Sequence, residues 1–275
     1  AENPDYAVMI GPFGSQHTLA AAPILQDAGL PAISPNSSNE RVWSAGECIF
    51  SVSDSDRIRS QRFARWFQEH RLLRGALLRD SSTWLARSLA SDFEAAFSGE
   101  IVYSGTYRGA RELAAQADDV SGSGAEFVYL TETRSEVAAD FVRALRRTGS
   151  RIPVAVQTAV GDPRLLQLEG VLLVSHFHPD APSPEVSRFT AEFRRVFGRD
   201  PSHRDAYALD ALHLADRAIR EAGFDREAVC RYLNQTPTFA GLLGEYSPRR
   251  PLDRRTPYVV EVRAGAYRLL RESIP

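Results

Sequence analysis

A glycine-punctuated turn near the start of the chain has the composition of an anion-binding loop. Gly11-Pro12-Phe13-Gly14-Ser15 follows an apolar run and precedes an Ala-rich stretch. Backbone N–H groups at such a helix start attract anions, and the Ser15 hydroxyl adds a donor. A P-loop would need a lysine, and all 33 basic residues of this chain are arginine. The turn therefore predicts either a site for a small anion or carboxylate, or a tight turn in which Ser15 caps a helix.

A second polar loop, Asn36-Ser37-Ser38, follows the next apolar segment, Ala32–Ser34. The loops after consecutive strands of a β-α-β unit lie at the same carboxyl edge of a sheet, where ligands of open α/β sheets bind. We therefore expect this loop and the glycine turn to lie side by side and to offer neutral donors to one small ligand. Taken singly, each serine also fits ordinary turn chemistry.

A third candidate is the segment "LLRDSSTW", which ends at Trp84. An aromatic side chain in a loop between a strand and a helix can stack on a ligand; a half-buried Trp84 without a ligand is the alternative. Arg79, at the expected end of the preceding strand, could hold an anion there. A surface salt bridge is the other interpretation of Arg79.

Catalytic and metal chemistry find little support in the sequence. Residues 176–180, "HFHPD", have the spacing of a zinc half-site, but no third ligand group is evident, so we expect a connecting segment and no metal. There is no G-x-S-x-G nucleophile elbow and no converging acid–base set, so we expect neither an enzyme nor a cofactor.

Composition narrows the class of protein further. The chain has 275 residues, a formal net charge of -2 and a pI of about 6.4, which gives no electrostatic reason for nucleic-acid binding. No run of 18 apolar residues predicts a membrane span, and the chain does not open with a signal peptide. Cys48 and Cys230 could form one disulfide, although two buried thiols are the favoured interpretation.

The pattern of apolar segments predicts an α/β fold, with parallel sheets covered by helices on both faces. The expected strands are Tyr6–Ile10, Ala32–Ser34, Ile49–Val52, Ala76–Leu78, Ile101–Ser104, Phe127–Leu130, Pro153–Val156 and Val171–Val174, with a terminal hairpin turning at Ala264–Gly265. The expected helices are Gln16–Ala28, Ile58–His70, Leu85–Phe97, Ala110–Val120, Ser135–Thr148, Pro184–Phe197, His203–Ala222 and Arg226–Asn234.

Several of these stretches resemble one family. They are Gly11-Pro12-x-x-Ser15-x-x-Thr18, "AAPILQDAGLPAISP", "IFSVSDSD", and more loosely "ADFVRALRRTG" and "DAYALDALHLA". Together they resemble the type I periplasmic solute-binding proteins, and more narrowly the branch that binds branched-chain amino acids (leucine, isoleucine, valine) for ABC importers. The resemblance covers nearly the whole chain.

The resemblance implies two Rossmann-like lobes, joined by a three-crossover hinge, that close on a small solute without catalysis. The crossovers would fall near Ser53–Asp56, Ser175–Pro182 and Leu242–Pro248. Lobe 1 would comprise residues 1–53 and 177–245, and lobe 2 residues 54–176 and 246–275.

The resemblance also assigns site residues. It implies that Ser15 meets a ligand carboxylate, that Ser38 supplies a loop hydroxyl, and that Trp84 is the ligand-facing aromatic. The other implied or candidate contacts are Phe13, Gly14, Asn36, Ser37, Thr133 and Thr158, with Arg79 and Gln157 as further candidates. Amino-acid-binding members carry an acidic residue near the position of Thr158. Here Gln157 and Thr158 stand there, with Asp162 offset, so a buried α-ammonium would lack its carboxylate.

The resemblance further implies a β-α-β unit before the segment that opens this chain, so we expect a truncated lobe 1 with an open sheet edge. A fragment of a longer protein, a degenerate lobe and completion by a partner are three explanations. We expect an extracytoplasmic protein, periplasmic or at the cell surface, that serves an ABC transporter permease. A sensor domain fused to a signalling protein, which could be cytoplasmic, is the alternative. An α/β enzyme ranks lower, and a dimer is left open.

Overall fold

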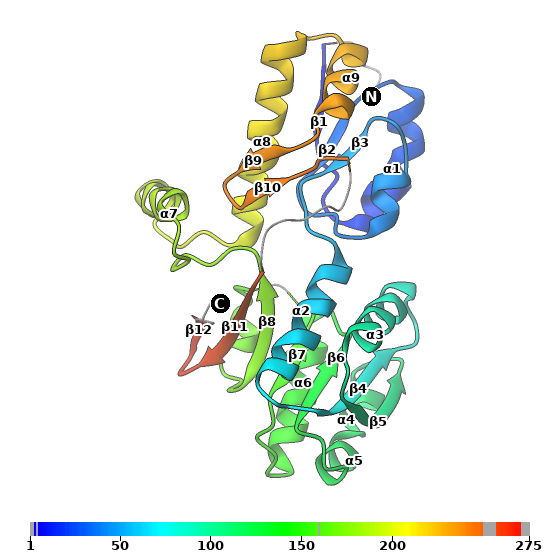
Figure 1. Ribbon diagram of the computed structural model, residues 1–275, viewed down its shortest axis with the longest axis vertical. Coiled ribbons are helices and arrows are strands. Elements are labelled where there is room, and N and C mark those ends of the chain that lie inside the picture. The colour runs from blue at the N-terminus through cyan, green and yellow to red at the C-terminus, as the bar shows by residue number, and fades with distance from the viewer. Residues whose placement is uncertain (1–2, 4, 159, 250–256, 271–275) are drawn as a thin grey trace. The chain divides into compact units, whose positions relative to one another are not determined.

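The computed structural model describes residues 3, 5–158, 160–249 and 257–270. The chain forms two compact units, each made from two separate stretches of sequence (Figure 1). Unit 1 comprises Ala1–Asp56 and His176–Thr256, and unit 2 comprises Arg57–Ser175 and Pro257–Pro275. Both contain parallel strands accompanied by helices, which confirms the α/β class expected from the sequence.

Unit 1 is built around a three-stranded parallel sheet of order β1-β2-β3. Its elements are β1 (Met9–Ile10), α1 (Ser15–Asp27), β2 (Ala32–Ser34), the 3-10 helix η1 (Glu40–Ser44), β3 (Ile49–Ser51), α7 (Pro184–Phe197), α8 (His203–Ala222), α9 (Arg226–Gln235), β9 (Phe239–Gly241) and β10 (Gly244–Tyr246). Helix α8 contacts β1 and β2. Within the described residues, β1 has a strand neighbour on one side only, so that edge of the sheet is open.

Helix α1 begins one residue earlier than the sequence predicts. Its N-cap is Gly14, at φ 89°, and no side chain caps the helix. The prediction that Ser15 is the N-cap is therefore wrong: Ser15 is the first helical residue, and its Oγ instead accepts a hydrogen bond from the backbone N of Asn39 (3.1 Å). The other end is as expected, because Gly29 follows the C-cap Ala28 at φ 60°, a conformation that favours glycine.

A hairpin that the sequence analysis missed overlaps the expected connector around Leu242–Pro248. Strands β9 and β10 pair antiparallel, with Phe239 opposite Tyr246, and these two buried rings lie 5.4 Å apart. Each strand has three residues, too few to show a clear alternation of apolar and polar positions. Residues 250–256, which follow this connector, lie outside the described residues.

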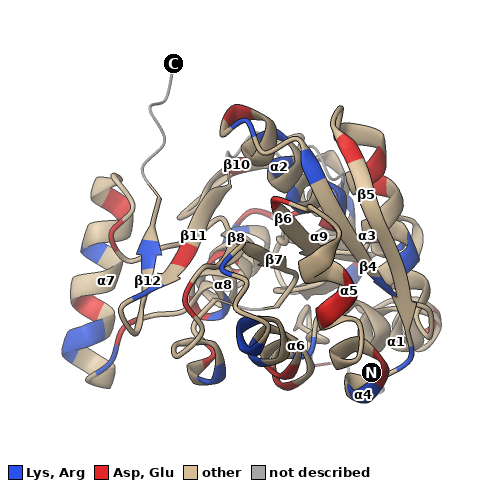
Figure 2. Ribbon diagram, turned by 90° about the horizontal axis from the view of Figure 1, so that it is seen from below, with Lys and Arg blue, Asp and Glu red and all other residues tan. Residues whose placement is uncertain are grey.

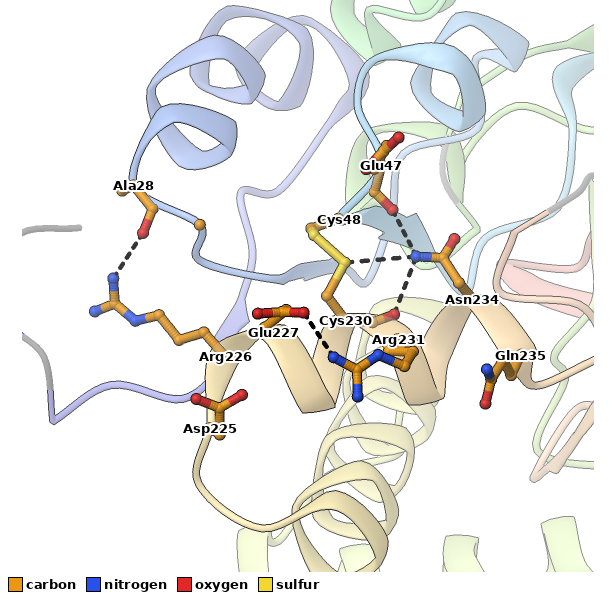
Figure 3. A pocket seen from close by; sticks show the side chains of 11 residues that line it. Ala28, Glu47, Cys48, Asp225, Arg226, Glu227, Cys230, Arg231, Asn234 and Gln235 are labelled. Atoms are coloured by element: carbon orange, nitrogen blue, oxygen red, sulfur yellow. Dashed lines mark hydrogen bonds and ion pairs between the residues drawn. A yellow bond between two sulfur atoms is a disulfide. The ribbon is translucent and has the colours of Figure 1, made fainter.

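A disulfide joins Cys48, just before β3, to Cys230 in α9. The preferred expectation of two buried thiols is therefore wrong. The two Cα atoms are 5.3 Å apart, although 182 positions separate the cysteines in sequence. No local pattern could show that proximity, because it depends on how α9 packs beside the β2–β3 connection (Figure 3).

Unit 2 contains a seven-stranded sheet of order β12-β11-β8-β7-β6-β4-β5. Its strands are β4 (Arg74–Asp80), β5 (Glu100–Tyr107), β6 (Phe127–Leu130), β7 (Val154–Val156), β8 (Val171–Ser175), β11 (Tyr258–Arg263) and β12 (Ala266–Leu269). Its helices are α2 (Asp56–Glu69, whose first residue belongs to unit 1), α3 (Trp84–Ala96), α4 (Ala110–Ala114), α5 (Ala117–Gly122), α6 (Ser135–Arg147) and the 3-10 helix η2 (Pro163–Leu165). Strands β8, β7, β6, β4 and β5 run parallel, and β11 is antiparallel to both of its neighbours.

The centre of this sheet is apolar on both faces, which explains why β6 lacks a polar alternation. All four residues of β6 are buried. On one face Phe127 stacks on Phe67 of α2, with ring centroids 3.7 Å apart, and Tyr129 stacks on Phe93 of α3 at 4.0 Å. Aromatic pairs of this kind contribute about 0.5–1.5 kcal/mol beyond the burial of their area. The other face packs against α4, α5 and α6.

Two further expectations have clear outcomes in unit 2. The single helix expected over Ala110–Val120 is wrong, because α4 ends at Ala114 and α5 starts at Ala117. Between them, the side chain of Gln116 bonds to the Thr106 carbonyl of β5 and to the Tyr103 hydroxyl, which draws the chain toward the sheet. The expected terminal hairpin is confirmed, with Ala264 and Gly265 both at positive φ in its turn.

The surface charges are mixed in sign. Along α7, for example, basic and acidic bands alternate instead of gathering on one face (Figure 2). None of the described helices is long and apolar enough to cross a bilayer.

Candidate functional site

In unit 1 a network of buried hydroxyl groups joins the glycine turn to the loop after β2. The hydroxyls of Thr18 and Ser34 both donate to the Pro12 carbonyl, at 3.1 and 2.7 Å. The Ser37 hydroxyl lies 2.8 Å from that of Thr18 and 2.6 Å from that of Ser34. Ser51 of β3 donates to the Ser37 carbonyl at 2.9 Å. The two loops are therefore held together at the carboxyl ends of β1 and β2.

The Ser37 hydroxyl is fully buried and bonds to other side chains of unit 1, so it is not available to a ligand. Ser15 is different, since its Oγ accepts from the backbone N of Asn39 and its own proton remains for another acceptor. Ser38 and Asn36 are both partly exposed, and neither side chain makes a hydrogen bond to any other described residue. The available polar groups at this edge are thus those of Ser15, Asn36 and Ser38, beside the uncapped start of α1.

Phe13 also lies in this turn, with its side chain pointing away from the core. It is 45% exposed, and the guanidinium of Arg204 in α8 lies 5.5 Å from the centre of its ring. The structure therefore brings Phe13, Gly14, Ser15, Asn36, Ser37 and Ser38 together at one edge of the unit 1 sheet.

The remaining predicted residues belong to unit 2, and they differ in surroundings. Arg79 forms an ion pair with Glu94 of α3 (3.6 Å) and donates to Ser104 of β5 (2.5 Å), so it takes the salt-bridge alternative. Trp84 is the first residue of α3, half-buried, and Thr83 caps that helix by accepting from the Ala86 N–H. Thr133 is exposed in the loop after β6.

Gln157 and Thr158 follow β7 and point to different roles. The Gln157 amide donates to the Tyr129 hydroxyl at 2.7 Å, which places it inside unit 2, and burial raises the pKa of Tyr129. Thr158 is only 5% exposed, and its hydroxyl has no hydrogen-bond partner among the described residues. A buried hydroxyl without a partner in the protein can bond to a ligand or to a water molecule.

A charged cluster that the sequence analysis missed lies at the carboxyl edge of the unit 2 sheet, where β4 and β6 end. Asp80 ends β4 and Glu132 follows β6, and their side chains are only 6% and 1% exposed. Arg134, whose side chain is 47% exposed, binds Glu132 through Nε and Nη2 (2.9 and 2.8 Å) and Asp80 through Nη2 (3.2 Å). The signal in the sequence was "TETR", an acid and an arginine two positions apart directly after a buried strand.

Neighbouring groups complete the cluster. The Glu132 carboxylate also accepts from the backbone N–H of Thr133 and of Arg134 and from the Tyr107 hydroxyl. Burial, together with the adjacent Glu132 charge, raises the pKa of Tyr107, so that hydroxyl stays a neutral donor. The hydrogen bonds that Arg134 donates to the Glu132 carboxylate raise the pKa of Arg134, which keeps the guanidinium charged.

Asp162, the offset acid noted in the sequence, is also engaged. Its carboxylate binds Arg164 through two side-chain hydrogen bonds (2.9 and 2.6 Å), and these bonds hold its pKa well below the usual range. Arg164 in turn contacts Glu136 at 2.9 Å. Asp162 therefore does not supply the acid that the position of Thr158 lacks.

A cavity of about 600 Å³ lies beside the disulfide in unit 1 (Figure 3). Its polar side chains bond mainly to the protein itself. Asn234 donates to the carbonyls of Glu47 and Cys230, both at 3.0 Å, and Arg226 donates to the carbonyl of Ala28 at 2.8 Å. Asn234 thus ties α9 to the β2–β3 connection and Arg226 ties it to the end of α1, which is a structural role.

The zinc-like spacing at residues 176–180 has another use in the structure. His176 lies 3.1 Å from Asp54, whose other oxygen accepts from the Tyr207 hydroxyl at 2.6 Å. The Nδ1 atom of His178 accepts from the backbone N of Asp180. Within the described parts of the chain, no group of three or more His, Cys, Asp or Glu residues is placed to hold a metal ion.

Comparison with models of known protein families identifies one family. The sequence matches the family model for periplasmic binding proteins over residues 2–265. No curated protein matches it.

Solved structures of solute-binding and transporter proteins are similar to this chain over nearly its whole length. One from Rhodospirillum rubrum, assigned as a branched-chain amino acid ABC transporter, is 26% identical, has a TM-score of 0.78, and covers 98% of this chain and 81% of its own. The substrate-binding protein LivJ of Streptococcus pneumoniae, in complex with isoleucine, is 21% identical with a TM-score of 0.83 (96% and 79% covered). A solute-binding protein of R. palustris, in complex with benzoate, is 18% identical with a TM-score of 0.79 (96% and 76% covered). At these identities the last two show a shared fold alone.

Proposed function

The chain belongs to the periplasmic binding protein family, and on that premise we propose that it binds a small carboxylate-bearing solute without changing it chemically. The polar loops at the carboxyl edge of the unit 1 sheet are the binding elements. The chain then acts as a ligand-binding protein, and no catalytic residues are assigned.

One observation carries this proposal: helix α1 begins without a side-chain cap, beside hydroxyl groups that have spare donors. The first N–H groups of a helix need acceptors, and its positive dipole end favours an anion. A solute carboxylate at this point would satisfy those N–H groups and accept from Ser15 and Ser38. The isoleucine and benzoate bound by the structural neighbours both carry a carboxylate.

The disulfide supports an extracytoplasmic location, which is also the usual location of the family. Disulfides persist in oxidising compartments and are rare where cellular thiols are kept reduced. Cys48 and Cys230 lie within bonding geometry, and the structure describes no unpaired cysteine. We therefore propose a periplasmic or cell-surface protein that delivers its solute to an ABC transporter permease. A ligand-sensing domain of a larger signalling protein is the second candidate, because the same binding loops would serve either role.

The test is a binding screen followed by site variants. A thermal-shift screen with small carboxylates, amino acids and amides should find at least one solute that raises the melting temperature, because binding to the native state stabilises it. Calorimetry with that solute should then show weaker binding for Ser15→Ala and Ser38→Ala, each by about 1–3 kcal/mol. Ser44→Ala is the matched control, since Ser44 is an exposed serine of unit 1 that donates to the Arg41 carbonyl. A screen in which no solute shifts the melting temperature would count against the proposal.

A further inference from the structure

Arg134 stands out at the carboxyl edge of the unit 2 sheet because it is exposed while its two partners are buried. Its side chain is 47% exposed, against 1% for Glu132 and 6% for Asp80. A solute that approaches this cluster therefore reaches the guanidinium before either carboxylate. Buried ion pairs are weak evidence for stability, so the arrangement is not by itself a sign of a stabilising role. What the two acids provide is a fixed position for one cation.

The guanidinium keeps donors free for another acceptor. An arginine has five N–H donors. Three are directed at carboxylate oxygens: one from Nε and one from Nη2 to Glu132, and one from Nη2 to Asp80. The two on Nη1 have no acceptor among the described residues. Because the side chain is already held, binding an acceptor there costs little further loss of side-chain freedom.

Among the described residues at this edge, the carboxylates leave no comparable partner for an ammonium group. Glu132 already accepts five hydrogen bonds, two from backbone N–H groups, two from the Arg134 side chain and one from Tyr107. Asp80 accepts from the backbone and the hydroxyl of Ser82 as well as from Arg134. Asp162 is bound by Arg164. Each of these carboxylates is therefore occupied by an arginine of the same unit.

A second, independent observation lies one strand away. The backbone N of Gln157 donates to the Glu132 carbonyl at 3.2 Å, which fixes the end of β7 beside the loop that carries Arg134. The next residue, Thr158, has the buried hydroxyl without a partner described above. A hydroxyl can donate to a carboxylate oxygen as readily as an arginine can.

We propose that Arg134 is a ligand-binding and specificity-determining residue, and that its free donors in unit 2 receive a carboxylate of an organic acid. This inference rests on the proposed function, because it names the chemical class of the solute that the chain binds. Acids without an α-amino group, dicarboxylates among them, are the expected ligands, and zwitterionic amino acids are disfavoured.

The experiment compares three probes on the full chain by isothermal titration calorimetry: glutarate, its monoamide glutaramate, and leucine. In the wild-type protein we expect glutarate to bind about tenfold or more tightly than glutaramate, as a charge-assisted hydrogen bond requires, and leucine to bind most weakly. In Arg134→Gln the ratio of glutarate to glutaramate affinity should fall to about one. Arg143→Gln is the control, since Arg143 is an exposed arginine of the adjacent α6 that pairs with Asp140, and it should keep the wild-type ratio.

Removing Arg134 leaves two buried carboxylates without their cation, so a second variant guards against unfolding. Glu132→Gln/Arg134→Gln removes one charge of each sign, and circular dichroism and the melting temperature report whether it folds. In that variant too the ratio should fall to about one. A ratio that survives in a folded Arg134 variant, or leucine as the tightest probe, would overturn the inference. The inference is also overturned if other solutes of the screen bind and neither glutarate nor glutaramate does. If nothing in the whole screen binds the wild-type protein, the proposed function itself fails.

Discussion

Reducing the disulfide should destabilise unit 1 much more than unit 2. The perturbation is a thiol reductant added to the wild-type protein, with the variant Cys48→Ala/Cys230→Ala as the form that cannot respond to it. Both cysteines belong to unit 1, where they tie α9 to the segment before β3. Breaking the bond removes a constraint on the unfolded chain while the contacts of the folded unit remain in place.

The size of the effect follows from the length of the closed loop. A loop of 182 residues gives a loop-closure stabilisation of about 5 kcal/mol in the chain-entropy model. Arg57–Ser175 of unit 2 lies inside that loop. If that unit stays folded while unit 1 unfolds, about 60 residues of flexible chain remain, and the same model gives about 4 kcal/mol. The expected loss is therefore about 4–5 kcal/mol, close to the upper end of the range for native disulfides.

Urea unfolding with tryptophan fluorescence can separate the two units, because Trp43 reports on unit 1 and Trp66 and Trp84 on unit 2. In a Trp43→Phe background the signal comes from unit 2 alone. We expect reductant to lower the free energy of unfolding of unit 1 in the wild-type protein and to leave the double-alanine variant unchanged. The reasoning is refuted if the reduced protein loses less than about 1 kcal/mol, or if the loss appears in the unit 2 transition.

Three further predictions concern stability. Ser37→Ala should destabilise unit 1 by about 1–3 kcal/mol in urea unfolding, because it removes the buried hydroxyl that bonds Thr18 and Ser34, whereas Ser44→Ala should have little effect. Phe127→Ala should cost unit 2 about 3–5 kcal/mol, since it removes a fully buried ring from the aromatic stack, and a much smaller loss would contradict that packing. Arg164 holds the pKa of Asp162 below its usual value, so this pair should stabilise unit 2 above about pH 4 and lose that contribution as the pH falls further. Between pH 6 and pH 3, the free energy of unfolding of unit 2, measured in urea, should fall less for Asp162→Asn than for the wild type.

The sequence predicted the elements whose signal is local. Buried apolar runs such as Phe127–Leu130 read as parallel strands, and Gly29 marked the end of α1. The rule that consecutive strands end at one edge brought the glycine turn and the Ser37 loop together. These inferences hold because they depend on periodicity, on backbone conformation or on a general property of β-α-β units.

What the sequence missed depends on contacts between distant segments. The pairing of Cys48 with Cys230 is set by how α9 packs, and the pairing of Arg134 with Asp80 by the adjacency of strands β4 and β6 in the sheet. Ser15 is not the helix cap, because α1 already begins at Ser15, and its hydroxyl accepts instead from the backbone N of Asn39 in the next loop. In each case a long-range partner, absent from any local window, decides the role of the residue.

The most direct test of the central claim is calorimetric titration of the wild-type protein and of Ser15→Ala with the solute that gives the largest thermal shift. If the uncapped start of α1 holds a solute carboxylate, the wild-type protein should bind with one site per chain. Ser15→Ala should then bind about 5- to 150-fold more weakly, while Ser44→Ala keeps the wild-type affinity. Equal affinities of wild type and Ser15→Ala would contradict the assignment of this edge as the carboxylate site.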